Sequence, residues 1–238
     1  MVEHEFIDLF GRLWWTTNLS TAIIIFSLIY IGMKLPNEVQ HKFGQVCGVF
    51  LILRNFWIHY YQIHLNLWTV ESSLPLHLCG VSAILSGIVL VTRNQKLYEL
   101  LFYWGIPGGY ISIVTPEFTI GTQGWLFLDY YISHGGIIFA ALYCTLIIGM
   151  RPSKGSWLRI FLWSQLFIPV VGVFNYLLGS NYMYINAPPE VENPFVVGDA
   201  PFHLIGFELA GFLHFWLLSL PFRKYYKKVK SNHPTFPL

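Results

Sequence analysis

The sequence is organised around residues 74–92, LPLHLCGVSAILSGIVLVT, an apolar segment just long enough to cross a lipid bilayer. Pro75 opens it, and proline suits the first turn of a helix because its missing N–H would have no partner there. In helical steps, His77 lies about 160° around the axis from Cys79. The residues on the side of Cys79 are small, as is typical of a surface that faces other membrane helices: Ser82, Ala83 and Ser86.

Composition indicates a membrane protein. Hydrophobic residues make up 55% of the 238 and charged residues only 11%, whereas a soluble domain has about 25% charged residues. The chain lacks the charge to cover a water-facing surface. It also has no phosphate-binding loop and no basic groove, so we expect no nucleotide, cofactor or nucleic-acid partner.

Hydropathy predicts an all-α, seven-transmembrane-helix bundle in a single domain, residues 1–238. The predicted spans are 17–34, 43–66, 75–92, 97–115, 126–149, 157–178 and 202–221. One connection, 179–201, is long and rich in proline and acidic residues, which is typical of a lid or a binding loop.

The distribution of positive charge predicts the orientation. Of the 14 Lys and Arg residues, all but two fall on one side of the predicted bundle. The exceptions are Arg12, on the other side, and Arg54, within the second span. By the positive-inside rule, the amino terminus is outside and the carboxyl terminus is cytoplasmic. We therefore expect a multi-pass protein, in the cell membrane if the source is bacterial.

Polar residues gather in the outer half of the predicted bundle. In the second span they form one stripe that should face the bundle or a water-filled cavity: Asn55, His59, Gln62 and Asn66. Others come from later spans and from the long outer connection: Tyr130, His134, Asn175, Asn181 and Glu208. Pro107 and Pro169 interrupt two spans near mid-membrane, where protein or a cavity must satisfy the freed backbone groups. The pattern indicates a polar site facing the extracytoplasmic side.

Cys79 is the predicted nucleophile of this site. Cys47 and Cys144 lie in the other half of the bundle, too far away to form a disulfide with it. A buried thiol needs a base or a cation to become a thiolate. His134 lies at comparable depth, whereas His77 points away from Cys79, so His134 is the predicted base.

Structural interpretations of the same residues remain open. An isolated membrane cysteine is commonly a small packing residue, and a histidine in a bundle commonly makes a structural hydrogen bond. Arg54 and Glu208 could form a structural ion pair. We expect no metal site, because no two histidines share ligand spacing on one helix face.

Three segments resemble the transmembrane protein 164 / YwaF family. They are LPLHLCG at 74–80, YISHG at 131–135 and NYLLGSNYM at 175–183. The resemblance implies a multi-pass acyltransferase acting on phospholipids, with the family's cysteine at Cys79 and its histidine at His134. The long amino-terminal extension of the eukaryotic members is absent here.

Together these lines predict a phospholipid acyltransferase that uses Cys79 and His134 through a thioester, with phospholipid and lysophospholipid as substrates. The residues expected to bind substrate are His59, Gln62, Asn66, His77, Tyr130, Asn175, Asn181 and Glu208, with His59, Gln62, Asn175 and Asn181 as candidate oxyanion donors. The alternatives are a lipid esterase with the same pair, and a small-solute transporter or receptor with a polar outer pocket. The sequence carries no indication of the oligomeric state.

Overall fold

The computed structural model describes residues 4–191 and 195–226, and nearly all of its regular structure is helical. The first three helices are α1 (Arg12–Lys34), α2 (Asn37–His64) and α3 (Leu78–Thr92). A broken helix follows, made of α4 (Gln95–Leu100), the π-helix η1 (Leu101–Gly105) and α5 (Ile106–Val114). The chain continues through α6 (Trp125–Leu146), α7 (Ser156–Leu178), the 3-10 helix η2 (Tyr182–Tyr184), α8 (His203–Ser219) and the 3-10 helix η3 (Leu220–Phe222).

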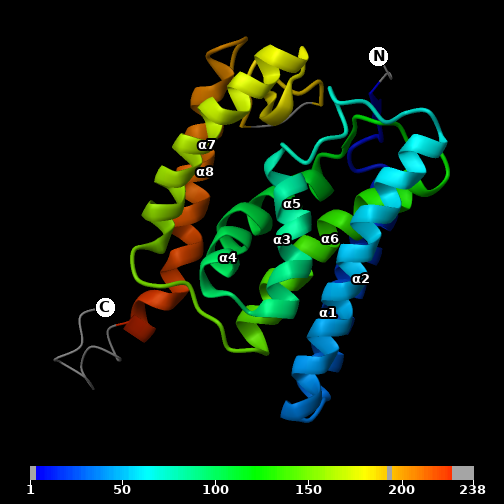
Figure 1. The fold of residues 1–238 in the computed structure, drawn as a ribbon. Helices are drawn as coiled ribbons and strands as arrows, with labels where there is room; N and C mark the ends of the chain where they lie inside the picture. The colour runs from blue at the N-terminus through cyan, green and yellow to red at the C-terminus, as the bar shows by residue number, and fades with distance from the viewer. Residues whose placement is uncertain (1–3, 192–194, 227–238) are drawn as a thin grey trace.

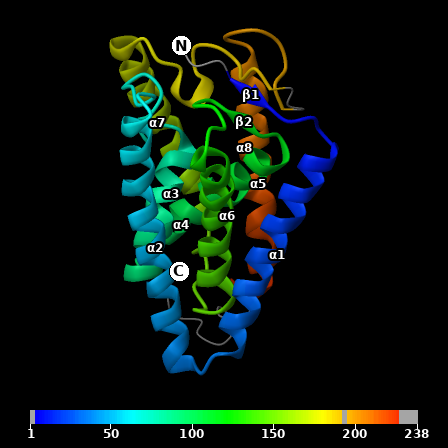
Figure 2. The ribbon, with the colours of Figure 1, turned by 90° about the vertical axis from the view of Figure 1, so that its right-hand side faces the viewer.

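With the broken helix taken as one segment, the long helical segments run alternately up and down (Figure 1). One end of the molecule holds the start of the described chain and the connections 65–77, 115–124, 179–191 and 195–202 (Figures 1 and 2). We call this the upper end, as it is drawn. The turns 35–36, 93–94 and 147–155 lie at the lower end.

Helix α6 is the centre of the bundle (Figure 2). It packs on α1, α2, α3 and α5, and the middle of its length is fully buried: Ile137, Ala140, Ala141, Tyr143 and Cys144. Helices α7 and α8 pair with each other and reach the rest of the molecule through α4 and η1. The helices that carry Gln62 and Cys79, α2 and α3, therefore pack on α6, which itself carries His134.

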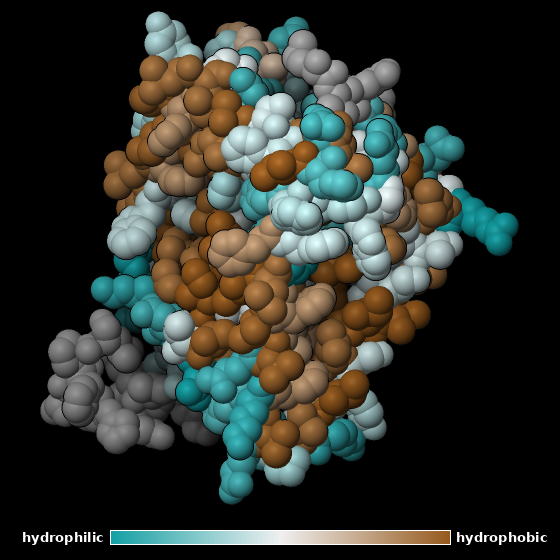
Figure 3. All heavy atoms as spheres, turned by 45° about the vertical axis from the view of Figure 1, so that its right-hand side comes forward, coloured by the Kyte–Doolittle hydropathy of each residue, from teal (hydrophilic) through white to brown (hydrophobic). Residues whose placement is uncertain are grey.

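Four helices are long and apolar enough to cross a membrane: Arg12–Lys34, Trp125–Leu146, Ser156–Leu178 and the segment from His203 to Tyr226. Figure 3 shows apolar side chains covering most of the surface between more polar ends. Large apolar side chains are more than half exposed on the outer helices, such as Phe26 on α1, Phe56 on α2 and Leu166 on α7. Such a belt is typical of a lipid-facing surface, so the chain is an integral membrane protein.

The remaining helices meet that criterion less well, for different reasons. Helix α2 is the longest of all, but its charged and polar residues lower its hydropathy. Helix α3 has only 15 residues, and the segment from α4 to α5 is divided into three short pieces. The break before Pro107 takes the form of a π-helical turn, a distortion that is frequent at functional sites.

The upper end is fastened by a two-stranded antiparallel sheet. Strand β1 (Glu5–Phe6) pairs with β2 (Glu117–Phe118), so that Glu5 lies opposite Phe118 and Phe6 opposite Glu117. The start of the described chain is thereby bound to the loop between α5 and α6. Hydropathy did not predict this sheet, because strands of two residues leave no periodic pattern.

Candidate functional site

Cys79 is the second residue of α3 and lies against α5. Its Sγ is 3.5 Å from Oγ of Ser112. A Cβ atom added at Gly108 would lie 3.1 Å from the same sulfur, so the absence of a side chain there leaves room for the thiol. The three cysteines Cys47, Cys79 and Cys144 are all free, as expected.

His134 lies on α6, and a hydrogen bond to a backbone carbonyl determines which nitrogen of its ring carries the proton. Its Nδ1 is 2.8 Å from the carbonyl oxygen of Tyr130. Because a carbonyl oxygen only accepts hydrogen bonds, Nδ1 carries the proton and the neutral ring presents a lone pair at Nε2. The histidine is thus held in the tautomer that a general base requires.

Helix α5 contacts both the thiol of Cys79 and the segment of α6 that carries His134. The Tyr130 ring stacks beside the His134 ring with centroids 4.3 Å apart, and its hydroxyl donates to the carbonyl of Ser112 at 2.9 Å. Next to Gly108, a Cβ at Gly109 would lie 3.1 Å from the carbonyl oxygen of His134. Between Cys79 and His134, both inside the described ranges, no direct hydrogen bond is formed. The thiol contacts α5 at Gly108 and Ser112, and the backbone of His134 contacts it at Gly109.

A buried carboxylate closes the upper side of this region. Glu117 accepts hydrogen bonds from Nδ1 of His4 at 2.7 Å, from the Tyr184 hydroxyl at 3.1 Å and from the backbone N–H of Glu190 at 3.3 Å. Burial and the adjacent Glu117 carboxylate raise the pKa of Tyr184 well above its usual value, so its hydroxyl stays protonated and donates. No sequence pattern singles out Glu117, because its partners His4 and Tyr184 lie far from it along the chain.

His77 differs from its predicted placement. It is the N-cap of α3, with extended backbone angles, so helical steps counted back from Cys79 do not apply to it. The statement that it points away from Cys79 therefore loses its basis. Its Nδ1 accepts the backbone N–H of Met183 at 3.1 Å, and its ring lies 5.2 Å from that of Tyr184. The Nε2 atom of the neutral ring consequently carries a proton and is a donor.

The predicted polar stripe of α2 is only partly formed. Gln62 is buried, and its Oε1 has no hydrogen-bond partner among the described residues. His59 is half-buried and accepts the indole N–H of Trp68 at 3.1 Å. Asn66 is not on the stripe, because α2 ends at His64 and Asn66 adopts a left-handed conformation (φ 57°) with an exposed side chain.

Both predicted asparagines hold the long upper loop together. Asn175 is buried, donates to the carbonyl of Tyr182 at 2.9 Å and accepts from the Tyr182 N–H and the Ser180 hydroxyl. Asn181 donates to the carbonyl of Ala187 and accepts from two backbone N–H groups of the same loop. These amides are already engaged in shaping the loop.

The alternative pairing of Arg54 with Glu208 is wrong. Arg54 forms a bidentate ion pair with Asp129 of α6 and donates to Oγ of Ser133 at 2.9 Å. Glu208 instead accepts from Nε2 of Gln165 at 2.6 Å, between α8 and α7. Within the described ranges, no three His, Cys, Asp or Glu side chains gather as a metal site would require.

Fold and site together define a helical integral membrane protein in which a thiol on α3 and an imidazole on α6 lie on helices that both contact α5. The model of the TMEM164 family matches residues 9–219, and the chain belongs to that family. This chain is also 25% identical over 213 residues to an "Uncharacterized protein" of Treponema pallidum (strain Nichols), covering 86% of this chain and 85% of that one. No solved structure matches the chain.

Proposed function

We propose that this protein is a phospholipid acyltransferase that spans the membrane seven times, with its amino terminus outside and its carboxyl terminus cytoplasmic. The apolar belt and the gathering of Lys and Arg beyond the lower ends of the helices support this arrangement. Cys79 then lies in the extracytoplasmic half, where acyl chains of the outer leaflet reach it directly.

In the first half-reaction His134 acts as the base. Its Nε2 removes the thiol proton, and the thiolate of Cys79 attacks the acyl ester carbonyl of a phospholipid. The tetrahedral intermediate collapses to a thioester on Cys79, and the lysophospholipid oxygen leaves with the proton returned by His134. The thiol must exchange its contact with Ser112 for one with the imidazole, and catalytic hydrogen bonds commonly tighten only once substrate is bound.

In the second half-reaction a lysophospholipid hydroxyl replaces the thiol as the proton donor. His134 deprotonates this hydroxyl, which attacks the thioester carbonyl, and Cys79 leaves as the thiolate and regains the proton. The Nε2–H of His77, two residues before Cys79, is our candidate donor to the oxyanion, with Gln62 and His59 as the candidates on α2. Loss of one such donor typically lowers the rate about 10²–10³-fold.

The observation that carries the proposal is the hydrogen bond from His134 Nδ1 to the Tyr130 carbonyl. With Nδ1 engaged in this way, Nε2 is left as the ring's acceptor, on a helix that packs against α3, which carries the thiol. Tyr130 also connects through Ser112 to Cys79, so the ring and the thiol are positioned by the same residues.

Intact-mass measurement of purified protein tests the mechanism. Incubated with phospholipid and no acceptor, the protein should gain one acyl group, mapped to Cys79, and lose it when lysophospholipid is added. The adduct should be absent in Cys79→Ala, slowed about 10²–10⁴-fold in His134→Ala, and unchanged in the control Cys47→Ala/Cys144→Ala.

Two results would contradict the proposal. Acyl transfer that persists in Cys79→Ala would show that Cys79 is not the nucleophile. An absence of any acyl adduct, with solute uptake or binding that survives Cys79→Ala, would instead identify a transporter or receptor. Release of free fatty acid in place of a new diacyl lipid would identify the reaction as ester hydrolysis by the same pair.

A further inference from the structure

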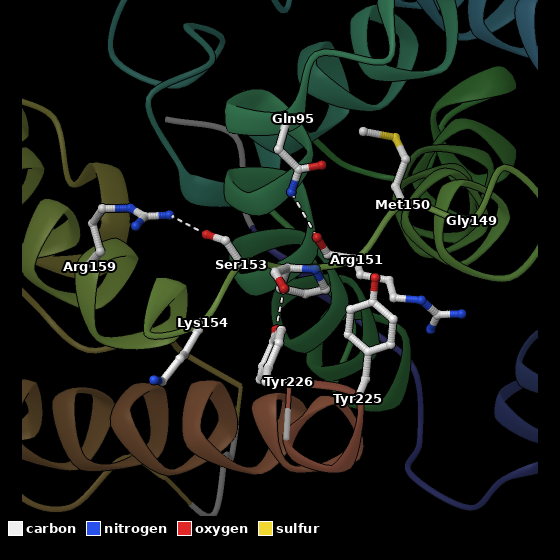
Figure 4. Close-up of a pocket in the computed structure, with 10 residues that line it drawn as sticks. Gln95, Gly149, Met150, Arg151, Ser153, Lys154, Arg159, Tyr225 and Tyr226 are labelled. Carbon is white, nitrogen blue, oxygen red and sulfur yellow. Dashed lines mark hydrogen bonds between the residues drawn. The ribbon is translucent and has the colours of Figure 1, made fainter. Parts of the chain in front are cut away.

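A cavity of about 440 Å³ opens at the lower end of the molecule, on the side opposite to Cys79. It lies between the loop from Gly149 to Gly155, the start of α4 and the last helical turn after η3 (Figure 4). The polar and cationic residues of its lining are Gln95, Arg151, Ser153, Lys154, Tyr225 and Tyr226, with Arg159 at its edge. Pockets for small ligands are typically about 300–1,000 Å³, so the volume suits a ligand and exceeds that of a few waters.

The loop that forms the cavity is held by hydrogen bonds from three directions. Gln95 donates to the carbonyl of Arg151 at 2.8 Å, and the Tyr226 hydroxyl donates to the carbonyl of Pro152. The backbone N–H of Ser153 donates to Glu99 at 2.8 Å. The cavity is therefore preformed, which lowers the entropic cost of binding.

Positive charge in the cavity exceeds negative charge. The Arg159 guanidinium is neutralised by Glu99, to which it is ion-paired, and it also donates to Ser153 Oγ. Arg151 lies over the ring of Tyr225, 5.1 Å from its centroid, and within the described ranges neither it nor Lys154 has a carboxylate partner. The first residue of α7, Ser156, follows directly, so the positive end of that helix dipole adds to the same field.

We propose that this cavity binds a phosphate group, carried by the headgroup of an anionic phospholipid or free in solution. Arg151 and Lys154 supply the unpaired cations, and the Tyr225 hydroxyl supplies a neutral donor. Basic pockets between membrane helices are known to take anionic headgroups. The site is independent of Cys79, and its occupation would anchor the end of α8 to the turn before α7.

Native mass spectrometry of the full-length protein in detergent tests the proposal. The Cys79→Ala background prevents any turnover of the lipid. With phosphatidylglycerol the protein should carry a lipid adduct at a lower concentration than with phosphatidylcholine. In R151Q/K154Q the affinity for phosphatidylglycerol should fall about thirtyfold, since each cation near a membrane surface contributes a factor of about five.

The control K34Q/K42Q removes two positive charges from the same end, away from the cavity, and should bind as the parent does. The conservative double variant R151K/K154R keeps both positive charges and should retain binding. It therefore shows whether R151Q/K154Q loses binding through the loss of charge or through misfolding. Millimolar inorganic phosphate distinguishes the two sources: unchanged lipid adducts identify the headgroup as the ligand, and displaced adducts identify a site open to free phosphate. Equal binding of both lipids, or equal losses in R151Q/K154Q and K34Q/K42Q, would overturn the proposal.

Discussion

At the scale of single residues, the Arg54–Asp129 ion pair matters most for the geometry of the site. Both side chains are nearly buried, and the pair joins α2 to α6 one turn above His134. Arg54 also donates to Ser133, the residue before His134. A buried pair adds little net stability compared with apolar residues of similar volume, but an unpaired buried charge is strongly destabilising. We therefore interpret it as fixing the register of α2 against α6.

This interpretation predicts different results for single and double substitutions. Arg54→Met should lower the free energy of unfolding by about 3–5 kcal/mol, because Asp129 is left buried without its cation. The double variant Arg54→Met/Asp129→Leu should recover most of that loss. Thermal unfolding in detergent measures both, and Arg12→Met, at an exposed position of α1, serves as the control. A double variant as unstable as Arg54→Met would show that the charges are not coupled.

The same pair shows where prediction from sequence stopped. Hydropathy identified Arg54 as a buried charge, and that was correct. Hydropathy could not identify the partner of Arg54. Whether Arg54 faces Asp129 depends on how α2 and α6 pack against each other, and no residue spacing within either helix reveals that packing. Glu208 was the predicted partner because it is a second charged residue within a predicted span, but it belongs to the separate α7–α8 pair.

At the scale of elements, α5 decides how closely Cys79 and His134 approach. The predicted interruption at Pro107 is confirmed in the form of the π-helix η1, since Pro107 has no N–H to continue the regular pattern. Gly108 and Gly109 follow it and allow α5 to lie against both α3 and α6. Helix α7, by contrast, continues through Pro169.

Gly108→Ala should therefore affect chemistry more than stability. The Cys79 sulfur is the one atom within 4 Å of the added Cβ, so the thiol must shift by a few tenths of an ångström. Alanine is otherwise favoured over glycine inside a helix by about 1 kcal/mol. We expect acylation of Cys79 to slow about tenfold or more, because reactivity depends steeply on alignment, while the unfolding temperature stays close to that of the parent.

Gly172→Ala is the matched control for this variant. Gly172 is also in a helix interior, and an added Cβ there meets no atom within 4 Å. It should change neither acylation nor folding adversely. If Gly108→Ala acylates as fast as Gly172→Ala, the close approach of α5 to the thiol has no role in the reaction.

The four helices that are long and apolar enough to cross a membrane were predictable because each is an apolar run of more than 20 residues, and their ends agree with the expected spans to within several residues. The start of α3 was not, since LPLHL reads as apolar helix, whereas the helix begins at Leu78. Because the helix begins three residues later than predicted, His77 is its N-cap, and the predicted direction of the His77 side chain no longer applies. The contact of Glu117 with His4 and Tyr184 was equally hidden, because it joins three loops far apart in sequence.

At the scale of the whole molecule, the proposed orientation depends on α3. With 15 residues it is about 22 Å long, shorter than the roughly 30 Å of a bilayer's hydrocarbon core. The preceding connection is folded onto the upper end, where the Tyr182 hydroxyl accepts from the N–H of Leu74 and donates to the carbonyl of Val70. If α3 crosses, a thinned bilayer or this covering loop must make up the difference.

Labelling on both sides of α3 tests the crossing directly. Glu71→Cys and Lys96→Cys place exposed thiols above and below it, in a chain whose native cysteines are replaced by alanine. If the proposed orientation is correct, a membrane-impermeant maleimide should label Glu71→Cys in intact cells and Lys96→Cys only after permeabilisation, because an excess of Lys and Arg favours the cytoplasmic side. The reverse pattern would invert the orientation and turn Cys79 toward the cytoplasmic leaflet. Equal labelling of both positions in intact cells would mean that α3 does not cross, and the seven-span arrangement would fail.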